Sequence, residues 1–246
     1  MRTNSSTRRP QISRGLAIVR VAVLFSGGKD SSFALWCGQM QGWDIEALVT
    51  VFSEAEDSWM FHYPAIKWTG LQAEAADIPQ FVIKTKGMKE EELDDLRRGL
   101  EELVRSSAID GIVSGAVASE YQRTRLDNLC ERLGLRSFSP LWHKNQEQLV
   151  REQIESGFEI IVTACHALGL DASWLGKKLG SRELDLLVKL KERYGLSVAF
   201  EGGEAETFVL KAPFFKRCLS IVKSIPRWYG DSGYLDIEEV RLEESV

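Results

Sequence analysis

The chain has 246 residues, of which 44% are apolar, so it can form one large domain or two small ones around a real core. No apolar stretch approaches the roughly 18 residues that a membrane-spanning helix needs, so we expect no membrane contact. Without the five arginines among residues 1–20, 26 basic residues face 36 acidic ones, which disfavours a general nucleic-acid-binding protein and leaves only a local basic patch open.

The four cysteines lie far apart and form no CxxC pair. That spacing argues against a zinc site and against a secreted disulfide scaffold. We therefore expect free thiols and a reducing, cytoplasmic location. The arginines and missing acids of residues 1–19 are typical of a transit peptide, but a disordered or over-extended N-terminus is the simpler interpretation.

From residue 20 onward, strands alternate with helices. This alternation predicts βαβ units, and therefore an α/β fold with a parallel sheet and helices on both faces. The predicted strands are 20–25, 45–52, 78–85 and 111–117, and the predicted helices are 31–41, 66–77 and 89–107.

The pattern changes near residues 121–135, where we expect a domain boundary. Helices are predicted at 123–133, 146–156 and 181–194, with a strand at 158–165 and short β-like runs within 217–240. The chain is thus expected to contain a first domain at 20–125, a smaller C-terminal α+β substrate domain at 126–235 and an acidic tail at 236–246.

The sequence SGGKDS, residues 26–31, follows the first predicted strand and opens a helix. Backbone N–H groups at such a helix N-terminus bind anions, and glycines let the backbone approach them closely. Hydroxyls of this loop and of Ser32 could assist, as could the charge of Lys29. Asp30 would repel a phosphate unless Mg²⁺ lay between them, and a helix N-cap is the alternative role for it.

The loop fits neither of two common phosphate-binding motifs. A Walker A loop needs a glycine where Val23 stands and a Ser or Thr where Asp30 stands. The dinucleotide fingerprint GxGxxG is also absent.

SGGKDS after a first strand resembles the pyrophosphate loop of the N-type ATP pyrophosphatases, the adenine nucleotide α-hydrolase superfamily. The resemblance implies a HUP-type, Rossmann-like ATP pyrophosphatase domain that uses ATP and Mg²⁺. It implies that Asp30 holds the metal and that Thr50 lies at the adenine. The other residues that it implies at the nucleotide are Ser26, Gly27, Gly28, Lys29, Ser31 and Ser32.

Three further stretches, 59–75, 115–142 and 201–210, resemble the diphthine–ammonia ligase family, and the likeness runs from about Val21 to about Phe215. It implies ATP-dependent amidation of diphthine on translation elongation factor 2. The diphthine carboxylate would attack the α-phosphorus, pyrophosphate would leave, and ammonia would displace AMP from the acyl-adenylate. The implied partners are elongation factor 2 carrying diphthine and ammonium, with no membrane and no direct nucleic acid, and a homodimer is left open.

Residues 201–207, EGGEAET, place three acids close together. Clustered carboxylates repel one another, so a metal or ammonium ion is a reasonable partner, and a carboxylate could take a proton from ammonium. A solvated acidic turn is the alternative. A glycine commonly precedes this motif in the family, whereas Phe200 stands here. The resemblance therefore does not fix the backbone geometry at the start of the turn. By the resemblance, Glu201 and Glu204 join Lys29 and Asp30 as catalytic candidates, while Gly202, Gly203, Glu206 and Thr207 bind substrate.

Residues 119–125, SEYQRTR, follow the fourth strand at the sheet edge where ligands bind in α/β proteins. Arg123 and Arg125 cannot face the same way on a helix. One is expected to meet a phosphate or the diphthine carboxylate, and the other solvent or Glu120. Arg123 is assigned a catalytic role, and the substrate-binding candidates here are Tyr121, Gln122, Arg123 and Arg125. His62 is a further substrate-binding candidate, with packing under a loop as its alternative.

Three other functions compete with this hypothesis. A transfer-RNA thiolase or other base-modifying ATP pyrophosphatase uses the same adenylation, but that class generally has catalytic cysteines or an iron–sulfur cluster. A nucleotide-binding sensor of the universal-stress type would not need Asp30 or the acid cluster. A glutamine-hydrolysing synthetase would need a glutaminase domain, for which the chain has no room, so free ammonia is the expected donor.

Overall fold

The computed structural model describes residues 18–53, 65–86 and 91–244. Its first half is a five-stranded sheet in the order β3-β2-β1-β4-β5, and every neighbouring pair runs parallel. The strands are β1 (Arg20–Leu24), β2 (Asp44–Ser53), β3 (Gln80–Thr85), β4 (Gly111–Val113) and β5 (Arg136–Phe138).

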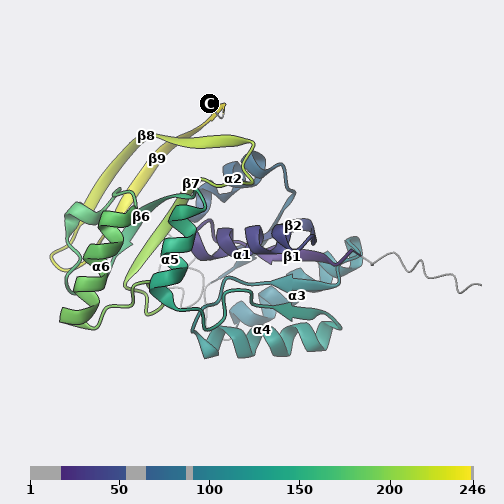
Figure 1. The fold of residues 1–246 in the computed structure, drawn as a ribbon. Helices are drawn as coiled ribbons and strands as arrows, with labels where there is room; N and C mark the ends of the chain where they lie inside the picture. The colour runs from purple at the N-terminus through teal and green to yellow at the C-terminus, as the bar shows by residue number, and fades with distance from the viewer. Residues whose placement is uncertain (1–17, 54–64, 87–90, 245–246) are drawn as a thin grey trace, which may run out of the picture.

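Helices cover both faces of this sheet because its strands alternate two apolar sets. On β1, Val21 and Val23 join the core under α1 (Lys29–Met40) and α2 (Thr69–Ala76), whereas Ala22 joins the core under α3 (Glu91–Ser106) and α4 (Glu120–Leu133). Figure 1 shows α3 and α4 on one side of the sheet and the second half of the chain on the other. The α/β prediction with helices on both faces is confirmed.

The second half is built on a four-stranded antiparallel sheet in the order β7-β6-β9-β8. Its strands are β6 (Glu159–Cys165), β7 (Ala205–Lys211), β8 (Arg217–Trp228) and β9 (Gly233–Glu244). The remaining helices are α5 (Gln146–Glu155), α6 (Ser181–Tyr194) and the short 3-10 turns η1 (Ile66–Trp68) and η2 (Ala172–Trp174). Residues 236–244, expected as part of a tail, thus form the later part of β9.

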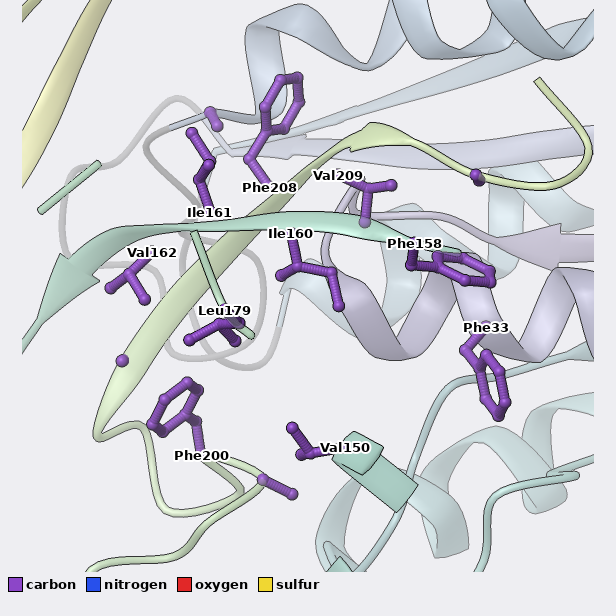
Figure 2. Packing of buried hydrophobic residues seen from close by; sticks show 14 of the residues in the cluster. Phe33, Val150, Phe158, Ile160, Ile161, Val162, Leu179, Phe200, Phe208 and Val209 are labelled. Atoms are coloured by element: carbon purple, nitrogen blue, oxygen red, sulfur yellow. The ribbon is translucent and has the colours of Figure 1, made fainter. Parts of the chain in front are cut away.

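One apolar core joins the two sheets, with α1 between them. Phe33 on α1 packs edge-on against Phe158, just before β6, with ring centroids 5.5 Å apart, and Figure 2 shows this pair beside Ile160 and Val209. The helix that opens at the SGGKDS loop packs against β7 and shares the apolar core with β6. Residues of the second half therefore contact that loop directly, through Ala199 and Thr207. The predicted domain boundary at residue 125 stays a prediction.

All four cysteines are free thiols. Burial raises the pKa of Cys130 and of Cys165 to about 12, so both are neutral at physiological pH. Among the residues that the structure describes, no helix is both long and apolar enough to cross a bilayer.

Candidate functional site

The SGGKDS loop leaves β1 and turns directly into α1. Gly27 takes φ +79°, and a Cβ there would lie 2.3 Å from Gln72 Oε1, so this position requires glycine. The helix begins at Lys29, two residues before the predicted start, and its N-cap is Gly28. Asp30 is therefore inside the first turn, and its alternative role as an N-cap is wrong.

Asp30 and Lys29 form an ion pair that is bound to the second half of the chain. The Lys29 ammonium donates to Asp30 Oδ2 at 2.5 Å and to the carbonyl of Ala199 at 2.6 Å. Gln153 on α5 donates its amide to Asp30 Oδ1 at 2.9 Å. Since Lys29 is only 2% exposed, its charge is committed to these contacts and not displayed to solvent.

A cavity of about 490 Å³ opens above the loop, within the size range of small-molecule sites. One wall comes from the first half of the chain and the other from residues 199–207. Of the predicted site residues, it is lined by Ser26, Gly28, Lys29, Asp30, Ser31, Gln122, Arg125, Glu201, Gly202, Gly203, Glu206 and Thr207. The fold thus brings SGGKDS and EGGEAET together although about 175 positions separate them.

Two of the three clustered acids face this cavity. Burial raises the pKa of Glu206 to about 8, with Lys29 lowering it and Asp30 adding to the rise. Burial also raises the pKa of Glu201, as does the charge of Asp30, against the opposing effects of Lys29 and the Ala118 N–H. At neutral pH the Glu206 carboxyl is therefore largely protonated, and it can exchange a proton near physiological pH.

A catalytic Glu204 would have to face the cavity, but its carboxylate is bound within the turn instead. Its carboxylate accepts from the N–H groups of Ser197 at 2.9 Å and Gly202 at 2.8 Å, and it does not line the cavity. Glu204 thus holds the turn before β7. Phe200 enters that turn at φ +63°, so it takes the left-handed conformation that suits the glycine expected there.

The two arginines of SEYQRTR face opposite ways because both lie on α4, which begins at Glu120 with Ser119 as its cap. Arg125 lines the cavity, stacks on Tyr121 at 3.4 Å, and keeps a buried Nε with no hydrogen-bond partner among residues 18–53, 65–86 and 91–244. Arg123 pairs instead with Asp127 and stacks on Trp142 in a separate surface depression. The structure therefore does not bring Arg123 to this cavity.

Some predicted residues lie at the margin of the site or outside it. Thr50 is fully buried on the opposite side of β2 from Val49 and Val51, which line the cavity, and its hydroxyl donates to the carbonyl of Phe25 at 3.0 Å. Ser32 is fully buried and does not line the cavity. His62 lies outside the described residues.

The sequence did not lead us to Gln153 or to the apolar end of the cavity, and Phe200 was noted only as a departure from the family pattern, not as a residue that lines the cavity. A buried amide among Leu149 and Val150 breaks the apolar face of α5, and such a break is a readable signal for Gln153. The apolar end could be expected only after the sheet order was known. It is formed by Leu24, Val49, Val51, Ile66, Leu93 and Leu96.

A magnesium ion fits the site only as a partner of a bound nucleotide. No group of three or more metal-binding side chains occurs in the described ranges, and Asp30 is the carboxylate of the loop itself. Each Asp30 oxygen accepts one hydrogen bond, which leaves further lone pairs. One carboxylate with phosphate and water ligands is a donor set that Mg²⁺ commonly accepts.

Comparison with known proteins gives two family matches. Residues 19–137 match the model of the diphthamide synthase N-terminal domain, and residues 145–242 match that of the diphthamide synthase C-terminal domain. A solved U34-tRNA thiolase, NcsA from Methanococcus maripaludis with its 4Fe–4S cluster, aligns over 76% of this chain and 70% of its own at 14% identity, with a TM-score of 0.37. That likeness is too weak to carry an argument.

Three relatives with similar sequences are named diphthine–ammonia ligases. The diphthine–ammonia ligases of Rattus norvegicus and Homo sapiens are 36% and 34% identical, and in both cases the alignment covers 93% of this chain and 94% of the relative. The diphthine–ammonia ligase of Schizosaccharomyces pombe is 35% identical over 89% of this chain and 39% of its own length. The chain therefore belongs to the diphthamide synthase family.

Proposed function

We propose that this chain is an ATP-dependent diphthine–ammonia ligase that acts on translation elongation factor 2 through an acyl-adenylate. A carboxylate oxygen of diphthine attacks the α-phosphorus of ATP, and pyrophosphate leaves with the electron pair of the broken bond. Ammonia then forms the C–N bond while the C–O bond to AMP breaks. The observation that carries the proposal is the single cavity lined by both SGGKDS and residues 199–207.

The cavity offers ATP a polar end and an apolar end. We assign the triphosphate to the loop at the N-terminus of α1, where Ser26, Gly28 and Ser31 line the cavity. The base would lie at the apolar end beside Val49 and Val51, with backbone groups of β2 near Thr50 as its hydrogen-bonding partners. Asp30 would hold Mg²⁺, which offsets the charge that pyrophosphate gains.

Arg125 is the cation best placed to meet the anionic reactants. Its buried Nε–H, which has no partner in the described part of the chain, would donate a hydrogen bond to a phosphate or to the diphthine carboxylate. Lys29 is less suited to that role, because its ammonium is held by Asp30 and Ala199. Arg123, predicted to be catalytic, faces the other depression, so we propose Arg125 in its place.

Glu206 is the acid best placed to handle ammonium. The deprotonated fraction of Glu206, whose pKa is raised to about 8, can take a proton from ammonium, and only the free NH₃ carries the electron pair that attacks the adenylate. Glu201 would hold the ammonium or the substrate beside it. Glu204 would act through the shape of the turn.

The experiment is an assay of purified protein with ATP, ammonium and elongation factor 2 carrying diphthine. We expect AMP and pyrophosphate in equal amounts, and mass spectrometry should find an amide where the diphthine carboxylate was. Formation of ADP, or turnover of ATP without amide, would contradict the proposal. Amidation that proceeds only with glutamine would also contradict it.

Glu206→Gln should separate the two half-reactions. Pyrophosphate exchange into ATP, measured with the diphthine-bearing factor and no ammonium, should stay close to that of the wild type, whereas amide formation should fall by about 10²-fold or more. Glu204→Gln weakens the turn and should lower both rates together, with a reduced unfolding temperature. An equal loss of both half-reactions in Glu206→Gln would remove Glu206 from the ammonia step.

The proposed partner is therefore the diphthine-bearing factor, with free ammonium as second substrate. A cytoplasmic location agrees with the four free thiols. A homodimer stays a prediction.

A further inference from the structure

We propose that Gln153 is a positioning residue that orients the Asp30 carboxylate for the nucleotide. This inference rests on the proposed function, in which Asp30 acts at the magnesium-bound triphosphate. Gln153 lies 123 positions from Asp30, and its Nε2 donates to Asp30 Oδ1 at 2.9 Å. The side chain of Gln153 is fully buried.

The stability of the fold does not explain why an amide side chain occupies position 153. It shares the buried face of α5 with Leu149 and Val150, where an apolar side chain would pack as well. Its Oε1 is buried and has no hydrogen-bond partner in the described part of the chain, and a buried acceptor without a partner destabilises the fold. What the amide does provide is one donor, and that donor is used on Asp30.

Two donors together fix the plane of the Asp30 carboxylate. Lys29 holds Oδ2 and Gln153 holds Oδ1, so rotation of the carboxylate would break one of these bonds. Gln153 is neutral, so it orients the carboxylate without cancelling its charge as a second lysine would. Asp30 is left about one-fifth exposed at the cavity, which keeps it open to a ligand.

The arrangement also makes the nucleotide loop depend on the second half of the chain. Gln153 comes from α5, and the carbonyl that anchors Lys29 belongs to Ala199. Without these contacts, the loop would keep its glycines and helix N-terminus but lose the fixed direction of its carboxylate.

The test compares Gln153→Met with Gln148→Met, a matched change at an exposed position of the same helix. ATP affinity is measured by calorimetry with MgCl₂ and with EDTA, and thermal unfolding is followed in parallel. For Gln153→Met, we expect the gain in ATP affinity that magnesium confers to fall about tenfold or more, with little change in EDTA. Gln148→Met should keep the full gain.

Asp30→Asn distinguishes the possible failures. If Asp30→Asn loses the magnesium-dependent gain while folded Gln153→Met keeps it, the positioning role is overturned and the proposed function stands. If the wild type shows no gain at all, the metal role of Asp30 fails and this inference fails with it. A lower unfolding temperature with an unchanged gain would make Gln153 a purely structural residue and would also overturn the proposal.

Discussion

Phe200 combines an unusual backbone conformation with a buried aromatic ring at the site. It adopts φ +63° although it is bulky and only 7% exposed, and its ring lies 5.5 Å from the Lys29 ammonium. A left-handed conformation costs a residue with a side chain about 1–2 kcal/mol. The burial of the ring over Lys29 offsets that cost, which explains how the turn tolerates a residue other than glycine.

At position 200, a glycine variant should therefore be more stable than an alanine variant, which is the reverse of the usual order. Both Phe200→Ala and Phe200→Gly lose the ring, but only glycine relieves the backbone, so the glycine variant should be the more stable by about 1 kcal/mol in urea unfolding. The control is Phe208 on β7, where glycine weakens a strand and the alanine variant should be the more stable. If alanine is preferred at both positions, Phe200 carries no strain.

The sequence predicted well which types of residue form the site, but it did not show which way each side chain points. The glycines and Asp30 of the loop follow from local rules, so they could be placed in advance. Which of Arg123 and Arg125 faces the cavity depends on how α4 docks on the sheet, and that docking is set by contacts distant in sequence. The same limit applies to Glu204 and Glu206, whose spacing could not show that one holds the turn.

At the scale of elements, β7 completes the N-terminus of α1. Gly28 provides no side-chain cap for that helix, and Thr207 Oγ1 accepts from the N–H of Lys29 at 3.1 Å instead. The carbonyl of Gly27 accepts from the N–H of Val209 and from the amide of Gln72. The loop is thus held at Gly27 and at Lys29 by residues far along the chain.

Thr207→Val removes the acceptor while keeping the shape of the side chain. The loss of a helix cap should lower the free energy of unfolding by about 1 kcal/mol, and ATP affinity should fall equally with and without magnesium, because the loop and not Asp30 is disturbed. Thr207→Ser keeps the hydroxyl and should behave like the wild type in both measurements. A serine variant as weak as the valine variant would show that the methyl group, and not the cap, matters.

Most elements of the first sheet were predictable because their apolar periodicity is strong. β5 has three residues and escaped prediction, since so short a strand carries no period. The strands β8 and β9 appeared only as short β-like runs, because polar residues occupy their exposed face and pairing between them, not composition, defines them.

At the scale of the whole molecule, the site exists only where the two halves meet. The parallel sheet supplies the loop and the apolar end of the cavity, and residues 199–207 supply the acids. The shared core around α1 fixes their relative position. One cavity can therefore hold ATP and the acyl group together, which an adenylation followed by amide formation requires.

An acyl-adenylate intermediate can be tested directly by following the oxygen atoms of the diphthine carboxylate. Elongation factor 2 bearing diphthine labelled with ¹⁸O in that carboxylate is incubated with the protein, ATP and ammonium, and the nucleotide is analysed by mass spectrometry. We expect one labelled oxygen in AMP, because the acyl-adenylate transfers it when the amide forms. Unlabelled AMP, or label in inorganic phosphate together with ADP, would contradict it.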